Sequence, residues 1–260
     1  MASAEPGKPE RRAPRRAGAA VRRRRPLRGE FSVPGDKSIS HRAVLLAAIA
    51  GGKSRIQGFS PAEDCRASLA LVRQLGCRVA TRPGGELAVT GLAPGAAPPD
   101  GSLTVDCGRS GTTMRLGLGL LAAQPINCVM TGHPQLLARP MARVVDPLRA
   151  MGARISMSPT GTAPLEVTGG GLLGITYTPP RASAQVKSAL LLAGLGAGSV
   201  TTVVEPNPTR DHTERLLLAM GAQLTVSRSG PGLRLRLRPG PLAPLRLRVP
   251  GDPSSAAVLA

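Results

Sequence analysis

Apolar and polar positions follow a pattern along the chain that returns three times. Each unit opens with an apolar helical run and a short strand, and continues with an amphipathic helix that ends in Leu-Gly or Met-Gly. Two short strands that alternate apolar and polar residues then follow, as in half-buried hairpins. The terminal glycines fit the position after a helix, where a left-handed backbone is needed. The predicted second helices span 66–76, 144–152 and 212–221, and the predicted strands span 54–56, 78–80, 87–89, 127–130, 154–156, 165–167, 199–204, 223–225 and 233–237.

The start of each unit carries a recognisable signature. Val33-Pro34-Gly35-Asp36-Lys37-Ser38 returns at 249–254 as Val-Pro-Gly-Asp-Pro-Ser, and intermediate copies begin at Ser110 and Ser183, in steps of 71–73 residues. Self-similarity at a fixed period is the mark of a repeat architecture. We therefore predict an α/β globule of three copies with pseudo-threefold symmetry and a strand before each opening helix. The alternative is chance similarity in a chain rich in Ala, Gly and Leu.

Charge divides the chain into two regions. The net charge is +19, and residues 1–29 hold ten basic and two acidic side chains, while the remainder holds 24 and 13. A segment of that composition cannot bury apolar surface, so we expect residues 1–29 to be a disordered tail. The rest is still strongly cationic, which favours an anionic partner. With no Trp and only three Phe and Tyr residues, the chain cannot build an aromatic stacking platform, which argues against a nucleic-acid partner.

Cysteine spacing and hydropathy bear on location and on metal binding. The four cysteines have no CxxC or His-paired spacing, so we expect reduced, partly buried thiols of a cytoplasmic protein and no metal site. No stretch of about 18 apolar residues is free of charged and turn-forming residues, so no membrane span is expected. The N-terminus also lacks the apolar stretch of a secretory signal.

The opening helices all begin with Ser or Thr near a small residue. Such helix starts leave backbone N–H groups pointing outward and are ready anion sites. If the three helices pack in parallel, their positive ends converge on one surface. Ordinary caps with solvated charges are the alternative. The basic residues near these starts are Lys37, Arg42, Arg109, Arg115 and Lys187.

Five segments, in order, resemble the 5-enolpyruvylshikimate-3-phosphate synthase family, the 3-phosphoshikimate 1-carboxyvinyltransferases. The resemblance covers residues 31–260. The segments are Val33-Pro34-Gly35-Asp36-Lys37-Ser38-Ile39-Ser40-His41-Arg42, Gly111-Thr112-Thr113-Met114-Arg115, Thr131-Gly132 through Arg139-Pro140-Met141, Ser183-Ala184-Gln185-Val186-Lys187-Ser188-Ala189, and Thr209-Arg210-Asp211-His212-Thr213-Glu214-Arg215.

The resemblance implies the inside-out α/β barrel of the enolpyruvyl transferases, with two globules of three βαβαββ repeats each. Residues 30–248 would form the three-repeat globule, and 249–260 the truncated start of a second globule that is mostly missing. The resemblance further implies a cytoplasmic enzyme of the shikimate pathway and aromatic amino-acid biosynthesis. It would be a monomer in its full-length form and would need no cofactor.

By resemblance, the reaction transfers the enolpyruvyl group of phosphoenolpyruvate to the 5-hydroxyl of shikimate 3-phosphate and releases phosphate. The family's catalytic acids would lie beyond Ala260, so we expect no catalytic residue within this chain and no turnover by it alone. Thr209 and Arg210 are weaker candidates, because a helix cap also explains Thr209. The implied ligands of shikimate 3-phosphate are Lys37, Ser38, Arg42, Ser183, Ala184 and Gln185, and those of phosphoenolpyruvate are Lys37, Gly111, Arg139 and Gln185.

Some positions depart from the family pattern. Arg109 stands where Asn is common, His133 stands where an acid is usual, and Gln135-Leu136-Leu137 replaces the common Ser-Leu-Arg.

The residues leave two other functions to consider. A UDP-N-acetylglucosamine enolpyruvyl transferase is disfavoured, because the loop 131–139 lacks the reactive Cys of that family. The other candidate is a non-catalytic anion- or nucleic-acid-binding protein, since an arginine run can bind phosphates by counterion release. Its support is the run Arg22–Arg25 and the alternating Arg234, Arg236, Arg238, Arg246 and Arg248.

Overall fold

The computed structural model describes residues 29–92 and 103–258, and of these residues 32–92 and 103–258 belong to one compact unit. The expected disordered tail (1–29), the run Arg22–Arg25 and the chain end at Ala260 lie outside the described residues, apart from Gly29. The domain boundary expected after Arg248 stays a prediction. No helix within the two described ranges combines the length and the apolar character needed to cross a membrane.

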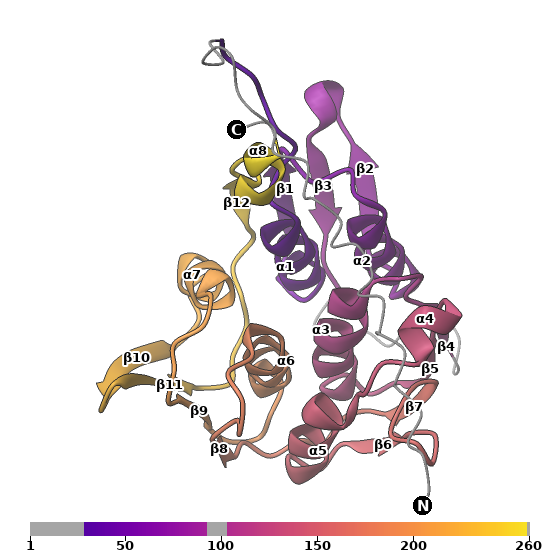
Figure 1. Cartoon of the computed structure of the whole chain (residues 1–260), viewed down its shortest axis with the longest axis vertical. Helices are drawn as coiled ribbons and strands as arrows, with labels where there is room; N and C mark the ends of the chain where they lie inside the picture. The colour runs from indigo at the N-terminus through magenta and orange to yellow at the C-terminus, as the bar shows by residue number, and fades with distance from the viewer. Residues whose placement is uncertain (1–28, 93–102, 259–260) are drawn as a thin grey trace, which may run out of the picture. The chain divides into compact units, whose positions relative to one another are not determined.

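Strands of the described residues form three four-stranded sheets with one shared plan (Figure 1). In each sheet one strand pairs in parallel with its neighbour, and the remaining two pairings are antiparallel. The orders are β12-β1-β3-β2, β4-β5-β7-β6 and β8-β9-β11-β10. The strands are β1 Lys53–Gln57, β2 Arg78–Thr81, β3 Leu87–Thr90, β4 Leu103–Asp106, β5 Asn127–Thr131, β6 Arg154–Ser156, β7 Leu165–Thr168, β8 Thr176–Tyr177, β9 Thr201–Glu205, β10 Leu224–Ser229, β11 Gly232–Leu237 and β12 Arg246–Arg248.

Two helices accompany each sheet, so the threefold repeat is confirmed. The opening helices α1, α3 and α6 lie between the three sheets (Figure 1), and α2, α5 and α7 are the predicted amphipathic helices. The short elements η1, α4 and α8 lie outside this pattern. The helices are α1 Lys37–Ala48, α2 Glu63–Gln74, η1 Pro83–Gly85, α3 Gly111–Ala122, α4 Pro134–Leu137, α5 Ala142–Ala150, α6 Ala184–Leu195, α7 His212–Ala219 and α8 Pro253–Ala257.

The first copy takes its parallel strand from the far end of the chain. Within residues 29–36, the described residues before α1, the only β-pairing is an isolated bridge of Gly35 with Gly251, so the strand predicted directly before this helix is wrong. Strand β12 fills that place instead, with Arg246 opposite Arg55 and Arg248 opposite Gln57. Strand β12 follows all three copies in the sequence, yet it completes the sheet of the first copy. This sheet therefore joins segments about 190 residues apart.

Glycines end the amphipathic helices as the pattern predicted. Gly76, Gly152 and Gly221 have φ angles of 92°, 99° and 81°. An L-residue with a side chain rarely adopts this left-handed conformation, whereas glycine has no Cβ to clash. Each glycine reverses the chain from its helix into the following hairpin. The local sequence therefore sets where these helices stop.

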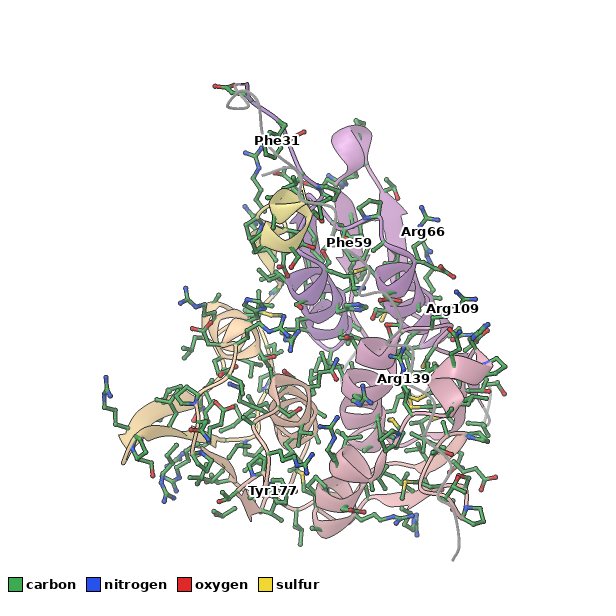
Figure 2. All side chains as sticks on the ribbon, viewed as in Figure 1. Phe31, Phe59, Arg66, Arg109, Arg139 and Tyr177 are labelled. Carbon is green, nitrogen blue, oxygen red and sulfur yellow. The ribbon has the colours of Figure 1, made fainter. Side chains whose placement is uncertain are left out.

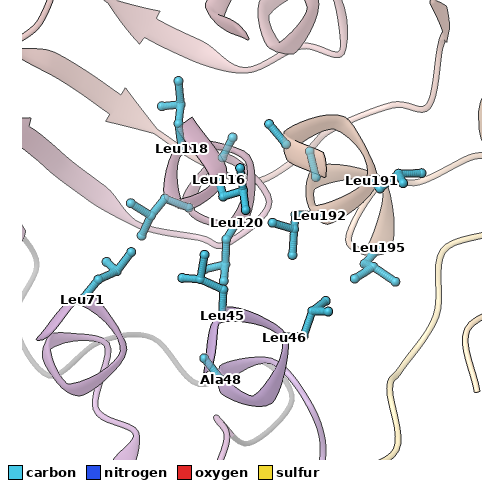
Figure 3. Close-up of a cluster of buried hydrophobic side chains, with 14 of the residues drawn as sticks. Leu45, Leu46, Ala48, Leu71, Leu116, Leu118, Leu120, Leu191, Leu192 and Leu195 are labelled. Atoms are coloured by element: carbon cyan, nitrogen blue, oxygen red, sulfur yellow. The ribbon is translucent and has the colours of Figure 1, made fainter. Parts of the chain in front are cut away.

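The core lies between the opening helices. Figure 3 shows leucines of α1, α2, α3 and α6 gathered in one cluster of buried side chains. All residues of α6 from Val186 to Leu195 are buried, which is typical of a helix enclosed on every side. Helices α3 and α6 approach so closely that a Cβ on Gly119 would lie 2.2 Å from the carbonyl oxygen of Ala189. The labelled leucines are Leu45, Leu46, Leu71, Leu116, Leu118, Leu120, Leu191, Leu192 and Leu195.

The four cysteines are buried and free of disulfides, as their spacing predicted. Burial raises the pKa of Cys65, Cys77 and Cys128 to about 11 and that of Cys107 to about 12. A thiol with a raised pKa is a weak nucleophile at neutral pH. These side chains therefore serve packing.

Candidate anion-binding site

Three helix starts are capped by polar side chains. The hydroxyl of Ser110 accepts from the N–H of Thr113 at 3.1 Å, and that of Ser183 accepts from Val186 at 3.3 Å. For α1 the cap is Asp36, which accepts from Ile39 at 2.8 Å, so the Ser or Thr start predicted there is wrong. Ser38 is the second residue of the helix, and its hydroxyl is left for other contacts.

Side chains of these first turns link α3 directly to α6. The amide nitrogen of Gln185 donates to the hydroxyl of Thr112 at 2.9 Å, and its oxygen accepts from Arg115 at 3.1 Å. Ser183 and Ala184 are half-buried in the same turn. The link holds Gln185 in one orientation beside the start of α3.

The start of α1 joins the same surface through α2. Lys37 is exposed and donates to the carboxylate of Asp64, and the carbonyl oxygen of Asp64 accepts from Thr113 at 3.2 Å. Deeper in the molecule, Nδ1 of His41 lies 2.7 Å from the hydroxyl of Ser68. Burial lowers the pKa of His41 to about 4, so its imidazole is neutral at pH 7. The starts of α1 and α3 therefore meet at α2.

Gly111 opens α3 beside two guanidinium groups. A Cβ on Gly111 would lie 2.9 Å from Nη1 of Arg115 and 3.0 Å from Nη1 of Arg139. Burial first, and then the charges of Arg143 and Arg139, lower the pKa of Arg115. Neither Arg115 nor Arg139 pairs with a carboxylate of the described residues. An anion between these cations and the helix start would relieve their repulsion. Figure 2 labels Arg139 beside α3.

Arg42 lies below the surface rather than on it. It is 4% exposed, and its nitrogens donate to Thr213 at 2.7 Å, to the carbonyl oxygen of Ser38 at 2.9 Å and to Ser188 at 2.9 Å. Burial, followed by the charge of Arg210, lowers its pKa to about 10. The side chain ties α1 to α6 and α7 beneath the helix starts.

Lys187 does not lie at the surface where a ligand anion would bind, so its prediction as a cation of the helix start is wrong. Its ammonium is fully buried, 2.7 Å from Oε2 of Glu205 and 2.6 Å from Oε1 of Glu214. Burial first raises the pKa of Glu214, and the hydrogen bond from Lys187 opposes that rise. We call Lys187, Glu205 and Glu214 the buried ion cluster.

Arg210 has a more prominent position than its sequence motif indicated. It follows β9 in an exposed connection, and its Nη1 lies 3.3 Å from the hydroxyl of Ser38. Thr209 is not a helix cap: Asp211 precedes α7, and Thr209 donates to Oε1 of Glu205 at 2.6 Å. The positive charge of the motif could have marked Arg210 as a candidate for anion binding. Its contact with Ser38 could not be predicted, because the two residues are 172 positions apart in the sequence. Lys37, Ser38, Gly111, Arg115, Arg139, Gln185 and Arg210 together form what we call the helix-start surface.

Arg109 and His133, two of the departures from the family pattern, lie against each other. Nη2 of Arg109 is 3.2 Å from Nε2 of His133, and Figure 2 labels Arg109 near α4. Both belong to loops that flank the start of α3. A cavity of about 660 Å³ lies elsewhere, on the outer face of the sheet β4-β5-β7-β6. It contains none of the helix-start residues.

Comparisons with known proteins agree with one another. The family model described as EPSP synthase (3-phosphoshikimate 1-carboxyvinyltransferase) matches residues 21–260. The 3-phosphoshikimate 1-carboxyvinyltransferase of Xanthomonas campestris pv. campestris (strain B100) is 51% identical over 234 residues, covering 89% of this chain and 52% of that protein. The enzyme of that name from Methylococcus capsulatus is 49% identical over 233 residues, with 89% and 52% covered.

A solved structure shows the same similarity in three dimensions. EPSP synthase from Acinetobacter baumannii superposes with a TM-score of 0.80 at 45% identity, covering 88% of this chain and 51% of that one. The chain therefore spans about half the length of the curated relatives it matches.

Proposed function

The chain belongs to the EPSP synthase (3-phosphoshikimate 1-carboxyvinyltransferase) family, and from this membership we propose that the whole protein transfers the enolpyruvyl group of phosphoenolpyruvate to shikimate 3-phosphate. The product would be 5-enolpyruvylshikimate 3-phosphate, with release of phosphate. The observation that carries the proposal is the helix-start surface, where three helix N-termini meet guanidinium groups that pair with no carboxylate of the described residues. Both substrates are multiply charged anions, which such a surface attracts.

The surface suggests separate places for the two substrates. Gly111, Arg115 and Arg139 lie together at the start of α3 and suit the compact carboxylate and phosphate of phosphoenolpyruvate, because guanidinium groups bind both in a planar fork. Ser38 and Arg210, with Ser183 and Ala184 on α6, suit shikimate 3-phosphate. Lys37 and Gln185 lie between these groups and would contact both ligands. Arg42 would support Ser38 from below, since its own donors are engaged within the protein.

Location and assembly belong to the same proposal. Four thiols without disulfides suit a reducing compartment, which supports a cytoplasmic protein. The monomeric state of the full-length protein stays a prediction. Arg234, Arg236, Arg246 and Arg248 are the exposed positions of half-buried strands, an arrangement that needs no nucleic-acid partner to explain it.

A fusion tests the proposed reaction. Residues 1–260 would be joined to the second half of the Xanthomonas campestris relative, and phosphate release would be measured with both substrates. We expect release only when both are present. A folded fusion that releases no phosphate would contradict the proposed function.

Replacing Lys37 with Ala should weaken binding of shikimate 3-phosphate by about 1.5–3 kcal/mol, the usual loss for a hydrogen bond to a charged group. Isothermal titration calorimetry on the fusion measures this change. Lys53→Ala is the matched control, because Lys53 is an exposed lysine on β1 outside the helix-start surface. Equal losses in both variants would show that only the overall charge matters.

Replacing Gly111 with Ala should reduce the affinity for phosphoenolpyruvate about tenfold while leaving the fold intact. The new methyl group would make an ordinary contact with Leu136 and would lie too close only to the ends of two flexible arginine side chains. These can move aside, but they would then leave the position in which they face an anion. Calorimetry gives the affinity, and urea unfolding should change by less than about 0.5 kcal/mol. Unchanged affinity would place the phosphoenolpyruvate site elsewhere.

A further inference from the structure

The buried ion cluster lies directly beneath the connection between β9 and α7. Lys187 comes from α6, Glu205 ends β9 and Glu214 lies in α7, and all three side chains are at most 5% exposed. A buried ion pair contributes little net stability compared with apolar packing of the same volume. Its fixed geometry is therefore the feature to explain.

The Glu205 carboxylate of the buried ion cluster also contacts the connection between β9 and α7. Oε2 of Glu205 accepts from Lys187, while Oε1 of the same group accepts from the hydroxyl of Thr209 at 2.6 Å. Because Lys187 is immobilised by two glutamates, the orientation of the Glu205 carboxylate is fixed. Thr209 is thus tied to the protein interior, although residues 206–208 beside it are exposed.

Arg210, the residue after Thr209, carries a positive charge at the surface. Arg210 is exposed, its Nη1 lies 3.3 Å from Ser38, and its charge helps to lower the pKa of the buried Arg42. No carboxylate of the described residues pairs with Arg210. Two guanidinium groups repel each other, so the charge of Arg42 disfavours the place of Arg210 beside Ser38. The contact with Ser38 is long, at 3.3 Å, and an anchor in the segment of Arg210 would help to hold it there.

We propose that Thr209 is a positioning residue: anchored by the Glu205 carboxylate that Lys187 fixes, it holds Arg210 beside Ser38 for the anion. This inference rests on the proposed function for the identity of the anion, a phosphorylated shikimate. The buried ion cluster then acts on recognition without touching the ligand. It converts a flexible connection into a fixed part of the helix-start surface, which lowers the cost of ordering Arg210 on binding.

Variants of Thr209 test the proposal better than variants of the cluster, because removing a buried charge can unfold the protein. Thr209→Val keeps the shape and removes the hydroxyl, and Thr209→Ser restores a hydroxyl. Thr225→Val, at an exposed position of β10, is the matched control. All three would be made in the same fusion that tests the proposed reaction, alone and with Arg210→Ala, because the chain by itself spans about half the length of its relatives.

The first measurement is calorimetric titration with shikimate 3-phosphate. Thr209→Val should weaken binding about fivefold, the scale of one hydrogen bond. Thr209→Ser and Thr225→Val should bind as the unmodified fusion does. In the Arg210→Ala background, Thr209→Val should not weaken binding further, because Thr209 affects binding only by positioning Arg210. An equal loss in both backgrounds would overturn the proposal.

The second measurement needs no ligand. Limited trypsin digestion followed by mass spectrometry reports the rate of cleavage after Arg210, with cleavage after the exposed Arg228 as the internal reference. Thr209→Val should raise the relative rate about fivefold, because proteolysis follows local opening. An unchanged rate would overturn the positioning role. If the unmodified fusion and every variant fail to bind shikimate 3-phosphate, the proposed ligand is wrong, while the cleavage rates still decide whether Thr209 holds Arg210.

Discussion

Replacing Lys187 with Met should lower the free energy of unfolding by about 3–5 kcal/mol at pH 7. Methionine fills a similar volume, so the loss comes from charge rather than from a cavity. Glu205 and Glu214 would remain buried without their shared cation. Oε2 of Glu214 already lacks a hydrogen-bond partner among the described residues, so the variant leaves this carboxylate almost unsolvated. Urea unfolding followed by circular dichroism measures the change.

The deficit of this variant should shrink as the pH falls. Burial already raises the pKa of Glu214, and loss of Lys187 would raise it further. Between the ordinary glutamate pKa of about 4.3 and the raised value, the folded state binds a proton that the unfolded state does not. Stability of the variant therefore increases as the pH drops through the folded-state pKa.

Two controls separate this effect from a general loss of charge. Lys53→Met, at an exposed site, should change stability by less than about 0.5 kcal/mol. Adding Glu205→Gln and Glu214→Gln to Lys187→Met should recover part of the loss, because a buried amide costs less than a buried carboxylate. A deficit that is independent of pH would show that packing, not the unpaired carboxylates, is responsible.

Replacing Gly119 with Ala should cost about 3 kcal/mol, at the upper end of the usual range for an overpacked core. The added Cβ would lie 2.2 Å from the carbonyl oxygen and 2.7 Å from Cα of Ala189. These are backbone atoms of α6, so no side chain can turn aside and the two helices must separate. The gain in helix propensity from Gly to Ala, about 1 kcal/mol, offsets only part of this cost.

The displacement should also reach the helix-start surface, because Thr112 and Gln185 hold α3 and α6 together at their first turns. We expect weaker binding of shikimate 3-phosphate by the folded fraction of the Gly119→Ala variant. Gly240→Ala is the control, since a Cβ there would meet no atom within 4 Å. Unfolding curves that coincide for the two variants would contradict the close contact between α3 and α6.

Elements set by neighbours in the sequence were predictable. The strands 154–156 and 165–167 appear as β6 and β7 within one residue, because alternation of apolar and polar side chains fixes which face of a strand is buried. Gly76, Gly152 and Gly221 marked three helix ends, since their left-handed backbone is a local requirement. The family motifs likewise identified Gly111, Arg139 and Gln185 as site candidates, which the structure places at adjoining helix starts.

Roles that depend on distant partners were not predictable. Lys187 looked like a surface cation at a helix start, yet two glutamates from β9 and α7 enclose it. Thr209 looked like a helix cap, yet the carboxylate of Glu205 takes its hydroxyl. Periodicity gives the face of a helix but not the charge that will stand opposite a residue on that face.

The amino-acid sequence by itself determined the threefold α/β repeat, the helix ends and the cationic motifs, because each follows from side chains within a few residues of one another. Tertiary structure alone decided that β12 closes the first sheet, that Arg42 lies buried against α7 and that Arg210 reaches Ser38. These contacts join segments 170–190 residues apart. Only the packing of three sheets around α1, α3 and α6 brings such segments together, and burial then selects which charges are paired and which are left for an anion.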